Sequence, residues 1–213
     1  ELTQIELTHL NYPPNIFPSE VPEFANATIT AYRTLEAAGV QILRAIALYL
    51  QLDENYFDRQ AKLGNSILRP IHYFPINNPQ DIPADAVRAA AHGDINLITL
   101  LMGASAEGLE ILRQDGNWIP FTALPNQIVV NVGDMLERLT NKKLKSTIHR
   151  VVNPPQGFWD TPRYSIPFFM HPVSEMDLSC LAECIDEQHP KQFDDLTAGE
   201  FLTQRLREIG LIK

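Results

Sequence analysis

Two histidines and one aspartate have the residue types and spacing that suit chemistry at a metal ion. His92 and Asp94 flank Gly93, and His149 lies in the alternating run of residues 146–152. Because alternate side chains of a β-strand point to the same face, His92 and Asp94 are predicted to stand side by side. Two imidazoles and one carboxylate on one side of a metal form the facial triad that holds non-haem Fe(II) and leaves positions open for substrate and O2. The sequence therefore predicts that His92, Asp94 and His149 bind Fe(II).

A second pair of residues follows the distal histidine. Arg163 and Ser165 are also two residues apart in a strand-like run. The planar guanidinium of arginine grips a carboxylate at two points, and a serine hydroxyl adds a third hydrogen bond. A site that holds iron and also binds a dicarboxylate suggests a 2-oxoglutarate-dependent oxygenase. A His-x-Asp alone is common by chance, and the alternative for Arg163 is a structural salt bridge.

The motifs lie within longer stretches that match a known family. The chain resembles the isopenicillin-N-synthase-like branch of the Fe(II)/2-oxoglutarate oxygenases, in its bacterial type. The resemblance runs from about the first helix to the C-terminus, and its specific motifs are central. They are Ala91–Asp94 with Ile98–Leu101, Val129–Leu136, Thr140–Asn141, Lys145–Pro154 and Arg163–Phe169.

This resemblance implies a fold and a set of roles. The fold is mainly β with flanking helices: a double-stranded β-helix (jelly-roll) core, a long helix before it and a helix after it. His92, Asp94 and His149 would bind iron, and Arg163 with Ser165 would hold the far carboxylate of 2-oxoglutarate. A family tyrosine that often touches 2-oxoglutarate falls on Tyr73. The expected reaction oxidises a C–H bond of a small molecule with O2 and releases succinate and CO2.

Two other functions stay open at this point. One is an oxidase of the isopenicillin N synthase type, which uses the same iron ligands without 2-oxoglutarate, so that Arg163 and Ser165 would hold a substrate carboxylate. The other is a jelly roll that binds a metal or ligand without catalysis. A zinc hydrolase is disfavoured because the sequence nominates no matching general base. Phe158 and Trp159, in the proline-rich loop before Arg163, are predicted to wall the substrate pocket, and an anchoring role for these aromatics is the alternative.

The predicted organisation has three parts. Residues 1–65 form a helical segment, 66–175 the catalytic core and 176–213 a C-terminal helical segment, all in one structural domain. The resemblance also implies an upstream part of the family domain that is missing from this chain, which begins at Glu1. Residues 1–18 read as an extended lead-in.

Several local signals predict individual elements. A long helix is expected from an N-cap at Ser19 to about residue 51, with an apolar stripe at spacings of three and four through Leu35, Ile42 and Tyr49. Gly39 inside this helix indicates close packing. A strand is expected over residues 67–75. Asp115-Gly116 between apolar runs predicts a hairpin, and Thr197 with Glu200 predicts a capping box at the start of the last helix.

The composition of the chain narrows the range of possible partners. The net charge of −9 argues against nucleic acid and anionic membrane surfaces, and no apolar run is long enough to cross a bilayer. Cys180 and Cys184 are the two cysteines and are expected to be free thiols in a cytoplasmic protein. Small-molecule substrate and O2 are the expected partners, and the oligomeric state is left open.

Overall fold

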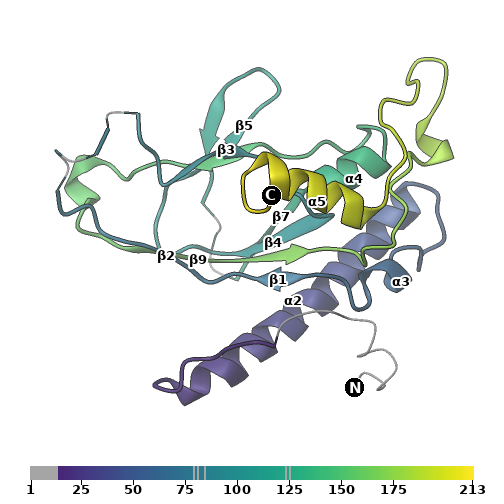
Figure 1. The fold of residues 1–213 in the computed structure, drawn as a ribbon. Helices are drawn as coiled ribbons and strands as arrows, with labels where there is room; N and C mark the ends of the chain where they lie inside the picture. The colour runs from purple at the N-terminus through teal and green to yellow at the C-terminus, as the bar shows by residue number, and fades with distance from the viewer. Residues whose placement is uncertain (1–13, 79, 81, 84, 123, 125) are drawn as a thin grey trace.

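The strands of the computed structural model form two antiparallel sheets (Figure 1). The structure describes residues 14–213 with the exception of 79, 81, 84, 123 and 125. The first sheet has β9 at its centre, and its strands are β1 (Ile67–Leu68), β2 (Ile71–Tyr73), β9 (Arg163–Met170), β4 (Ile98–Met102) and β7 (Ile128–Val132). The second has the order β3 (Ala89–His92), β8 (His149–Val151), β5 (Leu109–Leu112) and β6 (Trp118–Pro120). The two sheets agree with the predicted jelly-roll core.

Strand β9 organises the first sheet because it pairs on both edges. On one edge β1 and β2 follow each other in a single register, in which Leu68 opposes Phe168 and Tyr73 opposes Arg163. The strand predicted over residues 67–75 is therefore interrupted, because Pro70 has no N–H to continue the ladder. The other edge of β9 pairs with β4 from Ile98 to Met102.

Helix α2 (Pro22–Tyr49) packs beside β9 and β4 (Figure 1). Its N-cap is Val21, with a proline in the first turn, so the prediction of a Ser19 cap was wrong. Residues 14–18 are neither helix nor strand, in line with the predicted lead-in, whose residues 1–13 lie outside the described part of the chain.

The buried face of α2 differs from the predicted stripe. It consists of Leu35, Gly39, Leu43 and Ala47, whereas Tyr49 is 62% exposed. A Cβ on Gly39 would lie 2.4 Å from Met170 Sδ, which explains the glycine as a close approach of helix to sheet. One hydrophobic cluster includes residues of α2, the first sheet and the C-terminal helix.

The remaining helices are short. They are α3 (Asp58–Ala61), α4 (Asp134–Leu139), the 3-10 turns η2 (Gln156–Phe158) and η3 (Ala182–Cys184), and α5 (Ala198–Glu208). The predicted capping box at α5 is confirmed, since Thr197 and Glu200 bond reciprocally. The predicted hairpin is confirmed as β5 and β6, with φ +84° at Gly116. Among the described residues, no helix combines the length and apolar character needed to span a bilayer.

Candidate active site

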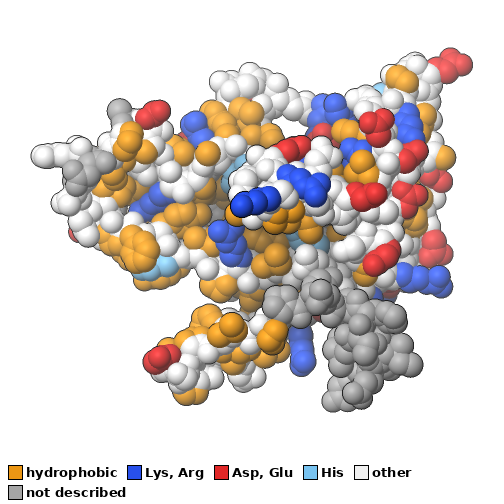
Figure 2. All heavy atoms as spheres, in the orientation of Figure 1, with side chains coloured by type: hydrophobic (Ala, Val, Ile, Leu, Met, Phe, Trp, Pro, Cys, Tyr) orange, Lys and Arg blue, Asp and Glu red, His pale blue; other side chains and the backbone are white. Residues whose placement is uncertain are grey.

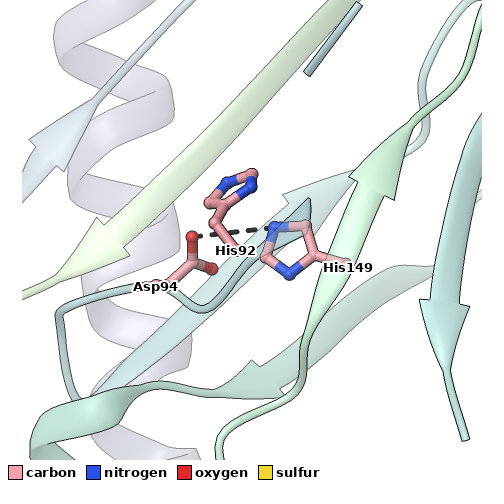
Figure 3. A group of neighbouring side chains, drawn as sticks. All are labelled: His92, Asp94 and His149. Carbon is pink, nitrogen blue, oxygen red and sulfur yellow. Dashed lines mark ion pairs between the residues drawn. The ribbon is translucent and has the colours of Figure 1, made fainter. Parts of the chain in front are cut away.

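A cavity of about 250 Å³ lies between the two sheets. One wall comes from β2, β4, β7 and β9, and the other from β3, β5 and β8. His92, Asp94 and His149 meet in this cavity, with one ligand atom of each within 4.8 Å of the others (Figure 3). The prediction that these three side chains converge is confirmed as a matter of geometry.

Both histidine rings are held in the same way. Nδ1 of His92 lies 2.7 Å from the carbonyl oxygen of Ala90, and Nδ1 of His149 lies 2.9 Å from that of Thr147. A carbonyl oxygen only accepts hydrogen bonds, so each Nδ1 carries the proton and donates it. Each Nε2 then keeps a free lone pair, the form in which imidazole binds a metal. Strand pairing places the two rings together, because His92 opposes His149 and their centroids are 4.5 Å apart.

The carboxylate of Asp94 is held through one of its two oxygens. Oδ2 accepts hydrogen bonds from Thr99 Oγ1 at 2.6 Å and from Asn131 Nδ2 at 2.9 Å. Oδ1 lies 3.7 Å from His149 Nε2, a pair drawn as a dashed line in Figure 3. Asp94 is only 6% exposed, so these two donors offset much of the cost of burying its charge. Oδ1 is thereby directed toward the imidazoles.

Asp94 lies just after strand β3 and not within it. Strand β3 ends at His92, and the chain turns so that the N–H of Asp134 bonds the carbonyl of Asp94 at 2.7 Å. A Cβ on Gly93 would lie 2.7 Å from both Asp134 Oδ1 and Ser146 Oγ. The prediction that Asp94 lies beside His92 was correct. Its reason, the alternation of side chains along a strand, does not hold because the strand ends at His92. The glycine between them leaves room for the close approach of the Asp134 and Ser146 side chains.

The predicted carboxylate-binding residues lie at another part of the same cavity. Arg163 is 2% exposed and Ser165 is 5% exposed, and Tyr73 opposes Arg163 across the β2–β9 ladder. The guanidinium Nε donates to the carbonyl of Ala106 at 3.2 Å, and Cζ lies 5.1 Å from the Tyr73 ring centroid. Burial lowers the pKa of Arg163 from its usual range. Among the described residues no carboxylate forms an ion pair with Arg163, so the structural salt bridge is not found.

Two further residues support the site without having been predicted. Thr99 and Asn131 oppose each other directly on β4 and β7, and both donate to Asp94. Their signal in the sequence is a single polar side chain inside an otherwise apolar strand. Both fell within the matching stretches described above, but spacing alone did not reveal their common target.

Two more arginines also line the cavity. Arg88 lies just before β3, and its Cζ is 5.9 Å from the Tyr73 ring centroid. Burial lowers the pKa of Arg88 from its usual range. Arg69, between β1 and β2, lines the cavity with an exposed side chain. Neither arginine stood out in the sequence.

The loop aromatics are not among the lining residues of the cavity. Trp159 donates from Nε1 to the carbonyl of Pro154 at 2.9 Å, and Phe158 is 61% exposed. These contacts match the anchoring alternative and not the predicted pocket wall. His72 stacks on Tyr164 at 4.6 Å between ring centroids, on the side of β2 opposite the cavity.

The chemistry of the donor set suits Fe(II). Two imidazole nitrogens and one carboxylate oxygen converge, and the support behind each ligand leaves the converging atom without another hydrogen-bond donor among the described residues. Such a set fits iron that must also accept substrate and O2. Asp94 is the only carboxylate among the described lining residues, so the cavity provides no second acid to act as general base in a zinc hydrolase.

Comparison with known proteins agrees with this geometry. The family model described as the 2OG-Fe(II) oxygenase superfamily matches residues 64–172. A 2-oxoglutarate-Fe(II) type oxidoreductase of Emericella nidulans is 31% identical over 198 residues, which cover 91% of this chain and 55% of the relative. A proline hydroxylase of Petromyces alliaceus is 36% identical, and the match covers 91% of this chain and 63% of the relative. The chain thus spans a little over half of these relatives.

Solved structures show the same fold. A 2OG-Fe(II) oxygenase family protein from Caulobacter crescentus has a TM-score of 0.86 and 46% identity, with coverage of 98% of this chain and 67% of that one. A Neurospora crassa protein, solved at full length in complex with alpha-KG and thymine, has a TM-score of 0.85 and 33% identity, with coverage of 93% and 62%. These neighbours confirm the double-stranded β-helix expected from the sequence.

Proposed function

The chain belongs to the 2OG-Fe(II) oxygenase superfamily, and from this premise we propose that it is the catalytic part of an oxygenase that uses Fe(II), 2-oxoglutarate and O2. The observation that carries the proposal is a single cavity that contains two different sites. One is the cluster of His92, Asp94 and His149. The other is the buried guanidinium of Arg163.

The first site would hold the metal. His92 and His149 offer Nε2, because backbone carbonyls fix the proton on Nδ1, and Asp94 offers Oδ1, because Thr99 and Asn131 occupy Oδ2. Fe(II) bound there would supply the redox chemistry that couples decarboxylation of 2-oxoglutarate to oxidation of a substrate C–H bond. The contribution of the protein is to hold these three ligands in place before the metal binds.

The second site would hold the cosubstrate. A cationic side chain that is 2% exposed needs an anion or good hydrogen bonds, and the described residues offer the Arg163 guanidinium the carbonyl of Ala106 and the hydroxyl of Tyr73 but no carboxylate. A carboxylate would satisfy its remaining N–H donors, and the hydroxyls of Ser165 and Tyr73 flank it on the paired strands. Among the alternatives left open above, an oxidase that does not use 2-oxoglutarate has less support, since relatives carry 2-oxoglutarate-Fe(II) oxidoreductase names.

The test combines metal and cosubstrate binding. Anaerobic addition of Fe(II) and 2-oxoglutarate should produce a weak visible charge-transfer band, and O2 should then release succinate even without a prime substrate. Replacement of Arg163 by Gln should weaken 2-oxoglutarate binding about 30-fold or more, the usual result of removing one partner of a buried charge pair. Binding of Fe(II) should stay at the wild-type level because Arg163 is not a ligand.

A matched control is Arg113→Gln. Arg113 lies on the exposed hairpin and pairs with Asp115 at 3.4 Å, so this variant removes the same charge away from the cavity. It should bind 2-oxoglutarate like the wild type. If neither band nor succinate appears, the proposed activity is wrong. If Arg163→Gln instead loses iron, the role assigned to Arg163 is wrong.

We also propose a class of partner and a cellular compartment for the protein. A small organic substrate and O2 follow from the family, and the net charge of −9 supports a partner other than a nucleic-acid strand. The thiols of Cys180 and Cys184 are both free, which supports a reducing compartment such as the cytoplasm.

A further inference from the structure

The cavity has an unusual charge balance for this protein. The chain as a whole carries a net charge of −9, yet the lining residues include three arginines and one carboxylate. The arginines are Arg69, Arg88 and Arg163, and the carboxylate is Asp94. The rest of the described lining is largely apolar, as in Leu101, Leu109, Ile111, Val129 and Phe169. On the face drawn in Figure 2, Lys and Arg side chains lie among hydrophobic ones, some of them over the C-terminal helix α5.

A count of formal charges indicates that the cosubstrate alone does not neutralise the positive charge of this cavity. Three guanidiniums, one carboxylate and a divalent metal sum to a formal charge of +4. The two carboxylates of 2-oxoglutarate reduce this to +2. Arg163 is buried and Arg88 is half-buried, so part of this positive charge is removed from water and favours a further anion. An anionic prime substrate would supply it.

Arg88 lies at the end of the cavity where the cosubstrate carboxylate is proposed to bind. The Cζ atoms of Arg88 and Arg163 are 5.9 Å and 5.1 Å from the centroid of the same Tyr73 ring. The positive charge of Arg88 contributes to the lowered pKa of Arg163, which is consistent with their proximity. Arg88 donates to the carbonyl of Thr161 at 3.3 Å, and its buried Nε has no hydrogen-bond partner among the described residues.

Arg69 lies farther along the sheet, toward the metal ligands. Its backbone N–H bonds the carbonyl of Pro167 at 3.0 Å, four residues along β9 from Arg163. Four strand residues span about 13 Å, since a strand rises ~3.3 Å per residue. Two residues beyond Pro167, Phe169 opposes Thr99, the donor to Asp94. Arg69 therefore enters the cavity from a level between the predicted cosubstrate carboxylate and the metal ligands.

We propose that the prime substrate is a small organic acid with an apolar body, and that Arg69 binds its anionic group. This inference rests on the proposed function and adds the substrate class to it. The guanidinium of Arg69 forms no ion pair within the described part of the chain, and its exposed position lets a substrate reach it from solvent. Apolar side chains of both sheets would contact the rest of the molecule, next to the metal.

The test compares acids with their neutral analogues on the holoenzyme. The full chain, loaded with Fe(II) and 2-oxoglutarate without O2, is titrated by calorimetry with phenylacetate, hexanoate and cyclohexanecarboxylate. The primary amide of each acid is titrated in parallel. At least one acid should bind about 10- to 100-fold more tightly than its amide, the factor expected for a hydrogen bond to a charged group.

Two variants assign the effect to Arg69. In Arg69→Gln the preference for acids over amides should disappear, while 2-oxoglutarate binding stays within about twofold of wild type, because Arg163 still holds the cosubstrate. Arg113→Gln, which removes a distant surface charge, should keep the preference. Binding of no acid, equal binding of acids and amides, or a preserved preference in Arg69→Gln each overturns the proposal.

The remaining outcomes separate this inference from the proposed function. If Arg69→Gln mainly weakens 2-oxoglutarate binding, Arg69 is a cosubstrate ligand and the substrate inference is wrong, although the oxygenase assignment survives. If wild type binds no 2-oxoglutarate at all, the proposed function fails first, and the anion preference loses its basis with it.

Discussion

Replacing Thr99 by Val should weaken metal binding although Thr99 is not a metal ligand. The hydroxyl of Thr99 donates to Asp94 Oδ2 at 2.6 Å, and both residues are buried, with 3% and 6% exposure. A hydrogen bond to a charged group contributes about 1.5–3 kcal/mol, and loss of such a partner behind a ligand typically reduces metal affinity about 10- to 100-fold. Asn131 keeps its own bond to Oδ2 at 2.9 Å, so we expect a loss near the lower limit, about 10-fold.

The assay is anaerobic calorimetric titration of the metal-free protein with Fe(II). Thr99→Ser keeps a hydroxyl and should bind nearly as well as the wild type. Thr203→Val removes a hydroxyl that bonds the carbonyl of Gly199 at 2.8 Å within α5, and it should leave Fe(II) affinity unchanged. If Thr99→Val binds Fe(II) as tightly as wild type, the hydrogen bond does not orient Asp94. If Thr99→Ser is as weak as Thr99→Val, packing and not the hydroxyl is responsible.

Two further predictions concern stability and are measured by urea unfolding. Burial lowers the pKa of His171 from 6.5 to about 4, so the unfolded chain takes up its proton first as the pH falls. The free energy of unfolding should therefore drop by about 3 kcal/mol more in wild type than in His171→Gln between about pH 7.5 and pH 4, with no difference in slope above that range. Gly39→Ala should destabilise the protein by about 1–3 kcal/mol despite better helix propensity, because the new Cβ overlaps Met170.

Each stability prediction has its own control. His72 is exposed on the face of β2 away from the cavity, so His72→Gln should keep the pH dependence of the wild type. If the free energy of unfolding falls equally in His171→Gln and wild type as the pH is lowered, other titrating groups cause the fall. For the helix, the cost of Gly39→Ala should shrink when Met170 is also replaced by Ala, since the overlapping atom is gone. An undiminished cost would mean that another contact opposes the methyl group.

Sequence patterns, together with the family resemblance, were enough to nominate the residues of the site. His92, Asp94 and His149 were found from residue type and spacing, and the structure brings them together. The hairpin at Gly116 and the capping box at Thr197 were also predicted correctly. The hairpin and the capping box depend on neighbouring residues, whose backbone preferences act over a few positions. Arg163, from the same pattern, proved to be buried in the same cavity.

Only the tertiary structure decided what surrounds these residues. The buried side of α2 is set by its contact with the first sheet, so Gly39 faces Met170 whereas Tyr49, a member of the predicted stripe, is exposed. Thr99 and Asn131 share Asp94 because β4 pairs with β7 in that register. Arg69 likewise reaches the cavity because its backbone N–H bonds the carbonyl of Pro167 in β9. Strand pairing joins residues that are far apart in the chain, and a local sequence pattern does not tell which distant residues will pair.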